Sequence, residues 1–145
     1  MEKRMLILFV SLLTLFNDQC VNATFVTITS TVGVVGKNPH YVQCDSHLIA
    51  GERFEHLDMI EIVNETTRII AEVHSDGYVW DEKSKPGFKN RPFLIKVINP
   101  TSLQVYYVDT VRSDAKLYQC QMFVRTPNDE TVKVHSEVIK VIIEG

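Results

Sequence analysis

The stretch Ser113-Asp114-Ala115-Lys116-Leu117-Tyr118-Gln119-Cys120 decides the fold. It places an Asp six residues before a Cys and a Tyr two residues before it. Because successive side chains of a strand point to opposite faces, Tyr118, Cys120, Met122 and Val124 would share one face. The pattern predicts a strand here whose inner face is apolar and carries the cysteine.

The first 23 residues have the three parts of a secretory signal peptide. Lys3 and Arg4 form a basic start, an apolar run covers 5–16, and a polar tail ends at Ala23. The run has 12 residues, whereas a membrane-spanning helix needs about 20. A buried core helix is the alternative, but the basic start and the lack of an amphipathic period argue against it. We expect cleavage after Ala23 and a single domain over 24–145.

The charge balance and the absence of known catalytic patterns exclude several classes of function. The chain has 15 Lys and Arg against 18 Asp and Glu, without a basic cluster, so nucleic acid and anionic membrane are poor partners. It contains no Gly-X-Ser-X-Gly, His-Glu-X-X-His or phosphate-loop pattern. Its five histidines lack the spacing of metal ligands. We expect no enzyme, no metal and no other cofactor, and contact with a membrane only through a segment outside this chain.

The cysteine count simplifies once the signal peptide is removed. Cys20 would leave with it, so that Cys44 and Cys120 remain. Two thiols in an exported domain are expected to be oxidised to one disulfide. The bridge would close a loop of about 76 residues, which is worth about 4 kcal/mol in the chain-entropy model. Two unpaired buried thiols are the alternative, which an oxidising compartment disfavours.

From residue 24 onward, short alternating runs are separated by turn residues, as in strands. Gly33 interrupts the first run, and a Gly inside a strand often marks a kink. No stretch has a helical period. The domain is therefore predicted to be all-β, with strands at 25–35, 40–45, 57–63, 68–73, 78–80, 93–98, 103–108, 116–124 and 131–143.

The spacing of Asp114, Tyr118 and Cys120 resembles the F-strand signature of the immunoglobulin superfamily. The resemblance implies an immunoglobulin-like β-sandwich in which the Cys44–Cys120 disulfide joins two antiparallel sheets. Asp114 would close the corner before strand F, and the Tyr118 hydroxyl would tie the backbone of that corner. Room for strands C′ and C″ between the cysteines, and an Arg91–Asp114 salt bridge, are expected of the V-type. The alternative for Arg91 is a solvated loop residue.

The chain also departs from the family pattern. The family places a Trp of strand C on the disulfide, but the only Trp here, Trp80, lies too far along the chain. We therefore expect Leu57 or Met59 to cover the disulfide. Lys116 stands where Gly or Ala is usual, and the last strand lacks the Gly-X-Gly bulge of antigen receptors. These departures favour a germline-encoded adhesion or immune-type receptor domain.

Domains of this type usually bind through the sheet of strands G, F, C and C′, which suggests a partner-binding face. With Cys120 inward, strand F would present an apolar anchor beside adaptable polar groups. The outward residues expected are Leu117, Gln119, Gln121 and Phe123.

Strand C adds two isoleucines to this candidate face. Ile60 and Ile62 are out of phase with Leu57 and Met59, so they would face water unless a partner covers them. The partner would be a protein ligand or a second copy of the domain. The alternative is that the phase is reversed and both isoleucines belong to the core.

Two turns are further candidates for function. The tip at 126–129 lies between strands F and G, and exposed loop tips often carry function. Asn64-Glu65-Thr66 is a glycosylation acceptor at a predicted turn.

These observations leave three hypotheses for an extracellular protein, secreted or at the cell surface. The first is a non-enzymatic protein-binding module, the membrane-distal recognition or adhesion domain of a receptor, with homophilic binding included. The second is a complete secreted immunoglobulin-like immunomodulator, of viral origin included, that captures a host ligand or receptor. The third is a structural spacer.

Overall fold

The computed structural model describes residues 23–37, 40–84, 86, 93–99 and 101–145. The predicted signal peptide, apart from Ala23, and the predicted partner Arg91 lie outside these residues. Two short 3-10 helices, η1 (Glu82–Ser84) and η2 (Arg112–Asp114), accompany the strands. The strands are β1 (Phe25–Ser30), β2 (Gly33–Val34), β3 (His40–His47), β4 (Arg53–Val63), β5 (Thr66–His74), β6 (Val79–Asp81), β7 (Leu94–Asn99), β8 (Ser102–Tyr107), β9 (Leu117–Arg125), β10 (Thr131–His135), β11 (Ile139–Lys140) and β12 (Ile143–Glu144).

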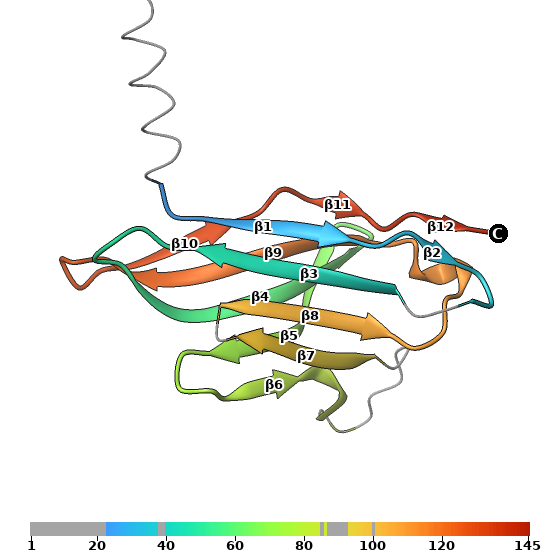
Figure 1. Ribbon diagram of the computed structural model, residues 1–145, viewed down its shortest axis with the longest axis horizontal. Coiled ribbons are helices and arrows are strands. Elements are labelled where there is room, and N and C mark those ends of the chain that lie inside the picture. The colour runs from blue at the N-terminus through green and yellow to red at the C-terminus, as the bar shows by residue number, and fades with distance from the viewer. Residues whose placement is uncertain (1–22, 38–39, 85, 87–92, 100) are drawn as a thin grey trace, which may run out of the picture.

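The strands form two layers that overlap in the view of Figure 1. One sheet has the order β1-β3-β8-β7, and the other has the order β10-β9-β4-β5-β6, with β11 also pairing with β9. Neighbouring strands within both sheets run antiparallel. The predicted all-β sandwich is therefore confirmed, with both extra strands, β5 and β6, at one edge.

The first predicted strand changes sheets at Gly33, as its kink suggested. β1 pairs antiparallel with β3, whereas β2 pairs in parallel with β12 at the other end of the chain. The approach is close, because a Cβ on Gly33 would lie 2.6 Å from Ile143 Cδ1 and 2.8 Å from Thr110 Cγ2. A residue without a side chain is needed where the chain crosses between the layers.

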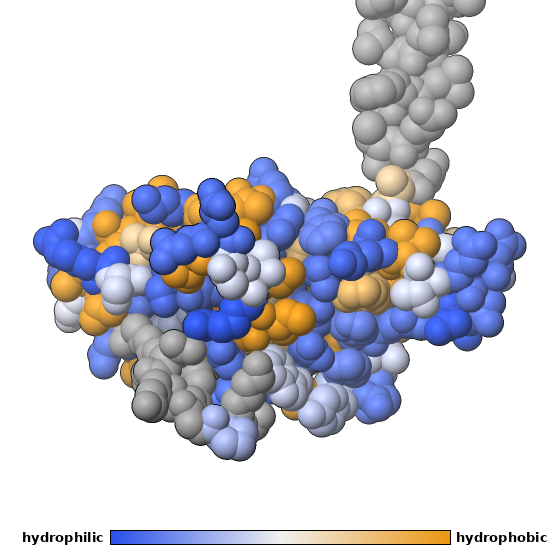
Figure 2. Space-filling view, turned by 180° about the vertical axis from the view of Figure 1, so that it is seen from behind, coloured by the Kyte–Doolittle hydropathy of each residue, from blue (hydrophilic) through white to orange (hydrophobic). Residues whose placement is uncertain are grey.

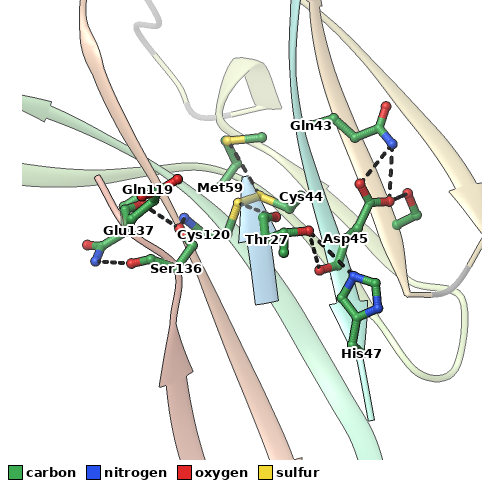
Figure 3. Close-up of a disulfide and its surroundings, with 11 residues drawn as sticks. Thr27, Gln43, Cys44, Asp45, His47, Met59, Gln119, Cys120, Ser136 and Glu137 are labelled. Atoms are coloured by element: carbon green, nitrogen blue, oxygen red, sulfur yellow. Dashed lines mark hydrogen bonds between the residues drawn. A yellow bond between two sulfur atoms is a disulfide. The ribbon is translucent and has the colours of Figure 1, made fainter. Parts of the chain in front are cut away.

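The core lies between the layers and is centred on the disulfide. Cys44 and Cys120 are bonded, with their Cα atoms 5.8 Å apart. Met59 covers the bridge as predicted, since its Sδ lies 3.7 Å from Cys44 Sγ (Figure 3). The buried core consists of Val26, Ile28, Val42, Cys44, Leu57, Met59, Ile70, Ala71, Val73, Phe93, Leu103, Val105, Tyr107, Tyr118, Cys120, Met122, Val124 and Val141.

The corner before β9 is tied by Asp114 rather than by the tyrosine. Asp114 is buried, and its Oδ2 accepts a hydrogen bond of 3.0 Å from the Val111 N–H. The same carboxylate oxygen lies 3.8 Å from His40 Nε2. The Tyr118 hydroxyl bonds the hydroxyl of Tyr107 on β8 at 2.9 Å. The prediction that the Tyr118 hydroxyl bonds the corner backbone is thus corrected, because this hydroxyl bonds Tyr107 of the opposite sheet instead.

Lys116, which replaces the usual small residue, has a partner in the structure. Its Nζ lies 3.2 Å from Oε1 of the buried Glu61. The other oxygen of Glu61 accepts a 3.1 Å hydrogen bond from Arg68, which also pairs with Glu82 at 3.0 Å. A buried carboxylate needs such partners, and Lys116 supplies one of them.

Several predicted strand boundaries differ from the observed ones, and two of the differences are large. β4 begins at Arg53 instead of residue 57, and the single last strand predicted at 131–143 is broken into β10, β11 and β12. The break begins at Ser136, whose Oγ accepts a hydrogen bond from the Cys120 N–H and donates one to the Glu137 carbonyl. The Ser136 side-chain oxygen thus accepts the hydrogen bond that a backbone carbonyl would accept in a regular ladder, and the regular pairing ends there.

Met59→Ala would remove the side chain that covers the disulfide and leave a cavity in the core. We expect the free energy of unfolding to fall by about 2–5 kcal/mol, whereas Met59→Leu keeps the volume and costs less than about 1.5 kcal/mol. Urea denaturation of the three proteins checks this. Equal stability of Met59→Ala and wild type would contradict the packing described.

Gly33→Ala would push a methyl group into the crossing between the layers. We expect a loss of stability of about 1–3 kcal/mol, as for other overpacked sites. Val32→Ala is the control: Val32 is 51% exposed, so its change should stay within about 0.5 kcal/mol. Thermal melts of both variants decide whether the crossing is as tight as described.

Candidate functional site

A row of aromatic rings crosses the outer face of the β10-β9-β4-β5 sheet. Cross-strand pairing sets His56 beside Phe123 on one side and beside His74 on the other. The Phe123 and His56 rings stack with centroids 4.2 Å apart, and the His56 and His74 rings stack at 4.9 Å. Tyr78 meets His74 edge-on at 5.3 Å, and Lys133 Nζ lies 5.7 Å from the Phe123 centroid. We call this set, Lys133, Phe123, His56, His74 and Tyr78, the ring row.

A second row, polar and partly buried, runs beside the ring row. Pairing sets His135, Gln121, Asp58 and Glu72 next to one another across four strands. Gln121 Nε2 donates a 3.0 Å hydrogen bond to Asp58 Oδ2, and a 3.1 Å hydrogen bond joins Gln121 Oε1 and His135 Nε2. Glu72 Oε2 and His74 Nε2 lie 2.9 Å apart, so the two rows are joined.

Asp58 is the unusual member of this cluster. It is 1% exposed, and its Oδ1 has no hydrogen-bond partner within the described chain. That oxygen lies 3.7 Å from His56 Nε2. Burial, and after it the charge of Glu72, raises the pKa of Asp58 to about 7. The carboxyl group therefore changes its charge near neutral pH.

The pKa of His56 moves in the opposite direction. Burial lowers the pKa of this imidazole below 6.5, and the neighbouring His74 lowers it further, against the raising effect of Glu72 and Glu55. His56 is consequently neutral at pH 7. Stacking of a neutral imidazole between Phe123 and His74 avoids placing a charge inside an aromatic row.

The predicted residues of strand F face outward, but they do not form one open surface. Leu117 is 39% exposed. Phe123 is half-buried within the ring row. Gln121 is buried, and its side chain is hydrogen-bonded to Asp58 and His135. Gln119 donates a 2.9 Å hydrogen bond to the Ser136 carbonyl.

β4, the predicted strand C, keeps the predicted phase, but one of its isoleucines does not face water. Ile60 is 5% exposed and is absent from the core cluster. It is covered on the outer face, where it pairs with Gln119 on β9 and with Ile69 on β5. The expectation of an exposed Ile60 is therefore wrong, and Ile62 is half-buried. Little apolar surface remains for a partner at these two positions.

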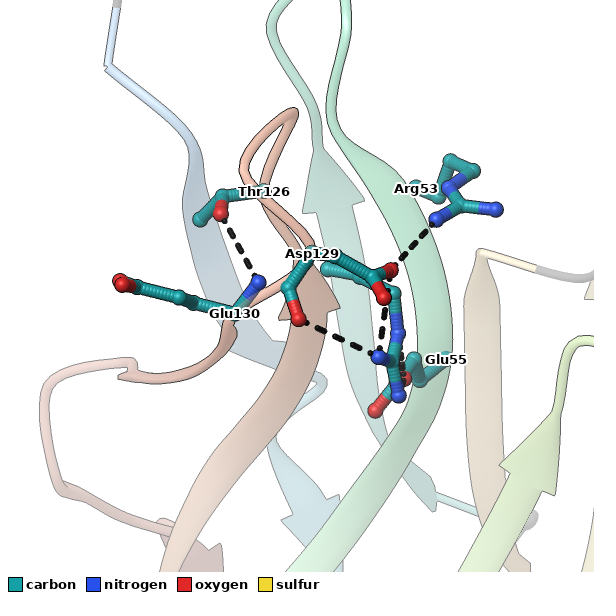
Figure 4. Close-up of polar contacts among 6 residues, drawn as sticks. Arg53, Glu55, Thr126, Asp129 and Glu130 are labelled. Carbon is teal, nitrogen blue, oxygen red and sulfur yellow. Dashed lines mark hydrogen bonds and ion pairs between the residues drawn. The ribbon is translucent and has the colours of Figure 1, made fainter.

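The tip between β9 and β10 is held by an ion-pair network instead of standing free (Figure 4). Arg125 Nη2 lies 2.7 Å from Glu55 Oε1, and Arg125 also reaches Asp129 at 3.3 Å. Asp129 pairs with the exposed Arg53 at 3.1 Å. Next to the network is a hollow of about 240 Å³ lined by Arg53, Phe54, Glu55, Ser75 and Arg125. Because the charges there are already paired, this hollow offers no free charge to a ligand.

The ring row could not be predicted from the sequence, because its histidines are far apart along the chain. A hairpin closed by Asn64-Glu65 would set Val73 opposite His56 if its register were regular, as it is from Val63↔Thr66 to Ile60↔Ile69. A bulge beyond Ile60 shifts the pairing by one residue, so that His74 replaces Val73. A one-residue shift exchanges the two faces of a strand, and no sequence pattern announced this one.

Within the described part of the chain, no three or more His, Cys, Asp and Glu side chains are placed to hold a metal ion. The helices of that part include none with the length and apolar character required to cross a membrane.

Comparisons with known proteins identify the fold. No family model and no curated protein sequence matches the chain. The structure of murine CRIg is similar, with a TM-score of 0.63 at 15% identity over 83% of this chain and 98% of that one. So is a chain from a study of T cell specificity and activation by the bacterial superantigen toxic shock syndrome toxin-1, with a TM-score of 0.62 at 14% identity over 83% and 99%. Together with the disulfide and the two antiparallel sheets, this likeness shows an immunoglobulin-like V-type β-sandwich.

Asp58→Asn would remove a group whose pKa in the folded protein, about 7, exceeds its ordinary value of 3.8. Such a group stabilises the fold while protonated, and this contribution is lost as the pH rises toward and through 7. Between pH 5 and pH 8, wild type should therefore lose about 2–3 kcal/mol of unfolding free energy relative to the variant.

Urea titrations at the two pH values measure this difference. Glu65→Gln, at the exposed β4–β5 turn, is the control and should keep the wild-type pH dependence. Parallel pH curves for Asp58→Asn and wild type would show that Asp58 titrates as an ordinary carboxyl group.

Proposed function

We propose that this domain is an extracellular protein-binding module that recognises its partner through the ring row and the residues around it. The observation that carries the proposal is the row itself. Four rings from β9, β4, β5 and the β5–β6 turn lie side by side on the outer face of a rigid sheet. Aromatic side chains that are already packed bind with little loss of rotamer freedom, which is why they are enriched at interfaces.

The composition of the surface supports recognition of a protein. In Figure 2 the apolar areas are broken up by polar ones, without one large apolar expanse on the visible face. Around the ring row, Lys133 is exposed, and the Glu72–His74 pair is partly exposed. A ring centre with charged neighbours resembles the central anchor and polar rim of a typical interface.

The predicted glycosylation site favours this end of the face. Asn64 is exposed at the β4–β5 turn, where it and Glu65 have φ values of 49° and 64°. Along β4, His56 lies eight residues away, which is roughly 26 Å in a strand. A glycan at Asn64 would cover the end of the face near Ile62 and Leu117 and leave the ring row open.

A second copy of the domain is the partner that the arrangement of the rings favours. Across the sheet, Lys133 lies at the β10 side of the row, and His74 lies at the β5 side. A two-fold axis parallel to the strands, between β9 and β4, would set His56 of one copy over Phe123 of the other. The same axis would bring each Lys133 opposite the His74 of the other copy, whose imidazole lies 2.9 Å from Glu72. Such an interface is self-complementary, as a symmetric dimer requires.

An exported location and a role in recognition complete the proposal. The Cys44–Cys120 bridge is the kind of disulfide that persists in oxidising compartments. We therefore place the domain outside the cell, as a recognition or adhesion domain. Capture of a different protein by the same face is the other outcome of the test below.

Phe123→Glu would place a carboxylate at the centre of the proposed contact. We expect the dissociation constant of the pair to rise by at least tenfold, which is about 1.4 kcal/mol, because the change removes the ring on which His56 stacks and places a charge in the contact. Sedimentation velocity over a concentration series measures it. The control is Leu94→Glu on β7 of the other sheet, where Leu94 is 51% exposed.

The two variants separate the possible faces. Loss of pairing in Leu94→Glu alone would move the contact to the β1-β3-β8-β7 sheet. Wild-type protein that stays monomeric throughout the series would refute self-pairing and favour a different protein as the partner.

A further inference from the structure

The two ends of the ring row carry opposite charges that do not meet within one copy. Lys133 on β10 is exposed, and its Nζ lies over the Phe123 ring. The Glu72 side chain on β5 is 24% exposed, and its Oε2 lies 2.9 Å from His74 Nε2. Because β9 and β4 separate β10 from β5, Lys133 and Glu72 are three strand spacings apart, which is roughly 14 Å. Each charge is therefore open to a group outside its own copy.

We propose, resting on the self-pairing above, that Glu72 sets the direction of the pair: Lys133 of each copy contacts Glu72 of the other, and the two copies run in the same direction. A two-fold axis parallel to the strands exchanges β10 with β5 and β9 with β4, so Lys133 lies opposite the His74 of the other copy. The Glu72 carboxylate lies beside that imidazole. A lysine ammonium on its flexible four-carbon stem reaches a carboxylate in this position.

Lys133 supplies the positive charge of this contact. It is the one lysine or arginine of β10. His135, two residues along the strand, is the residue that the register sets directly opposite Glu72 of the other copy. Its Nε2 lies 3.1 Å from Gln121 Oε1, so this ring nitrogen already has a partner in its own copy.

Antiparallel arrangements of the two copies fit the face less well. An axis at right angles to the strands and along the ring row sets each residue of the row opposite itself, so Lys133 of one copy would meet Lys133 of the other. Moved to lie between the two rows, such an axis sets the rings of Phe123 and His56 over the polar row. Asp58 and Gln121 of that row are buried and offer almost no surface to them. The parallel axis is the one of the three that places rings on rings and opposite charges together.

The direction of the pair determines where its ends lie. The β9–β10 tip stands at one end of the face, and the β4–β5 turn stands at the other. The C-terminal strands lie toward the turn, because Lys140 on β11 pairs with Leu117, which pairs with Ile62 (Figure 1). In a parallel pair both tips lie at one end, and both C-terminal strands leave at the other. Such a pair joins copies that stand side by side rather than copies that approach from two opposed surfaces.

Charge reversal tests the contact. Lys133→Glu and Glu72→Lys each turn two attractions of the pair into two repulsions. We therefore expect the dissociation constant of either variant, measured by sedimentation velocity, to rise by about tenfold. An equimolar mixture of the two variants should pair about as tightly as wild type, since each mixed pair again has opposite charges at both contacts. Lys96→Glu, at an exposed position of β7 on the other sheet, is the matched control and should pair as wild type does.

Spin labels test the direction separately. Asn128→Cys at the exposed tip and Glu65→Cys at the exposed turn carry labels at opposite ends of the face. Double electron–electron resonance should place two labels at 128 closer together than a label at 128 and a label at 65 of the other copy. The reverse order would overturn the parallel direction. Circular dichroism verifies the fold of every variant.

The outcomes separate this inference from the proposed function. Wild type that is monomeric throughout would overturn self-pairing and the inference with it. Wild type that pairs, with Lys133→Glu pairing equally well, would overturn the contact and leave self-pairing intact, because an antiparallel pair merely exchanges one like-charge contact for another. Single variants that both fail to pair and do not recover in the mixture would also overturn the contact.

A neutral variant keeps the test decisive if Glu72→Lys does not fold. Glu72→Gln then takes its place. Its mixture with Lys133→Glu should pair more tightly than Lys133→Glu alone, because each mixed pair regains one attraction and loses both repulsions. Equal pairing of the mixture and of Lys133→Glu alone would overturn the contact.

Discussion

The phase of β4 is the constraint on which the structure depends. Leu57 and Met59 are fully buried between the sheets, and Met59 lies against the disulfide that joins them. Because side chains alternate along a strand, this burial forces His56 and Asp58 to the outer face. A slip by one residue would turn their polar groups into the apolar core and the core residues outward, so the packing of the interior fixes the chemistry of the exterior.

The parts of the fold that the sequence could predict are those set by local alternation. The residues of β9 from Tyr118 to Val124, the disulfide and the change of sheet at Gly33 all follow from spacing or from the chemistry of single residues. The unpredicted parts arise from contacts between distant segments. The Tyr118–Tyr107 bond needs the opposite sheet, and the break at Ser136 needs a side chain to replace a backbone partner.

The candidate site was only partly foreseeable for the same reason. The outward phase of Phe123 followed from that of Cys120, and the structure keeps it. The stacking of His56 on His74 depends on one bulge in β5, which no residue pattern marks. Ile60 followed the expected phase but is covered by its lateral neighbours. Alternation along a strand predicts the face to which a side chain points, but not how much of it is exposed.

Asp58 shows that the outer face is not selected for stability alone. Burial of a carboxyl group with a pKa of about 7 costs folding free energy at neutral pH, and an apolar residue at this position would avoid that cost. Local choices that work against stability tend to mark functional positions. Asp58 lies beside the face that we propose as the binding surface.

The most direct test of the central claim is a series of amide NMR spectra of the wild-type protein at neutral pH over increasing concentration. The account predicts that shifts and line broadening gather at His56, His74, Phe123 and Lys133. Changes confined to the β1-β3-β8-β7 sheet, or a spectrum that does not vary with concentration, would contradict it.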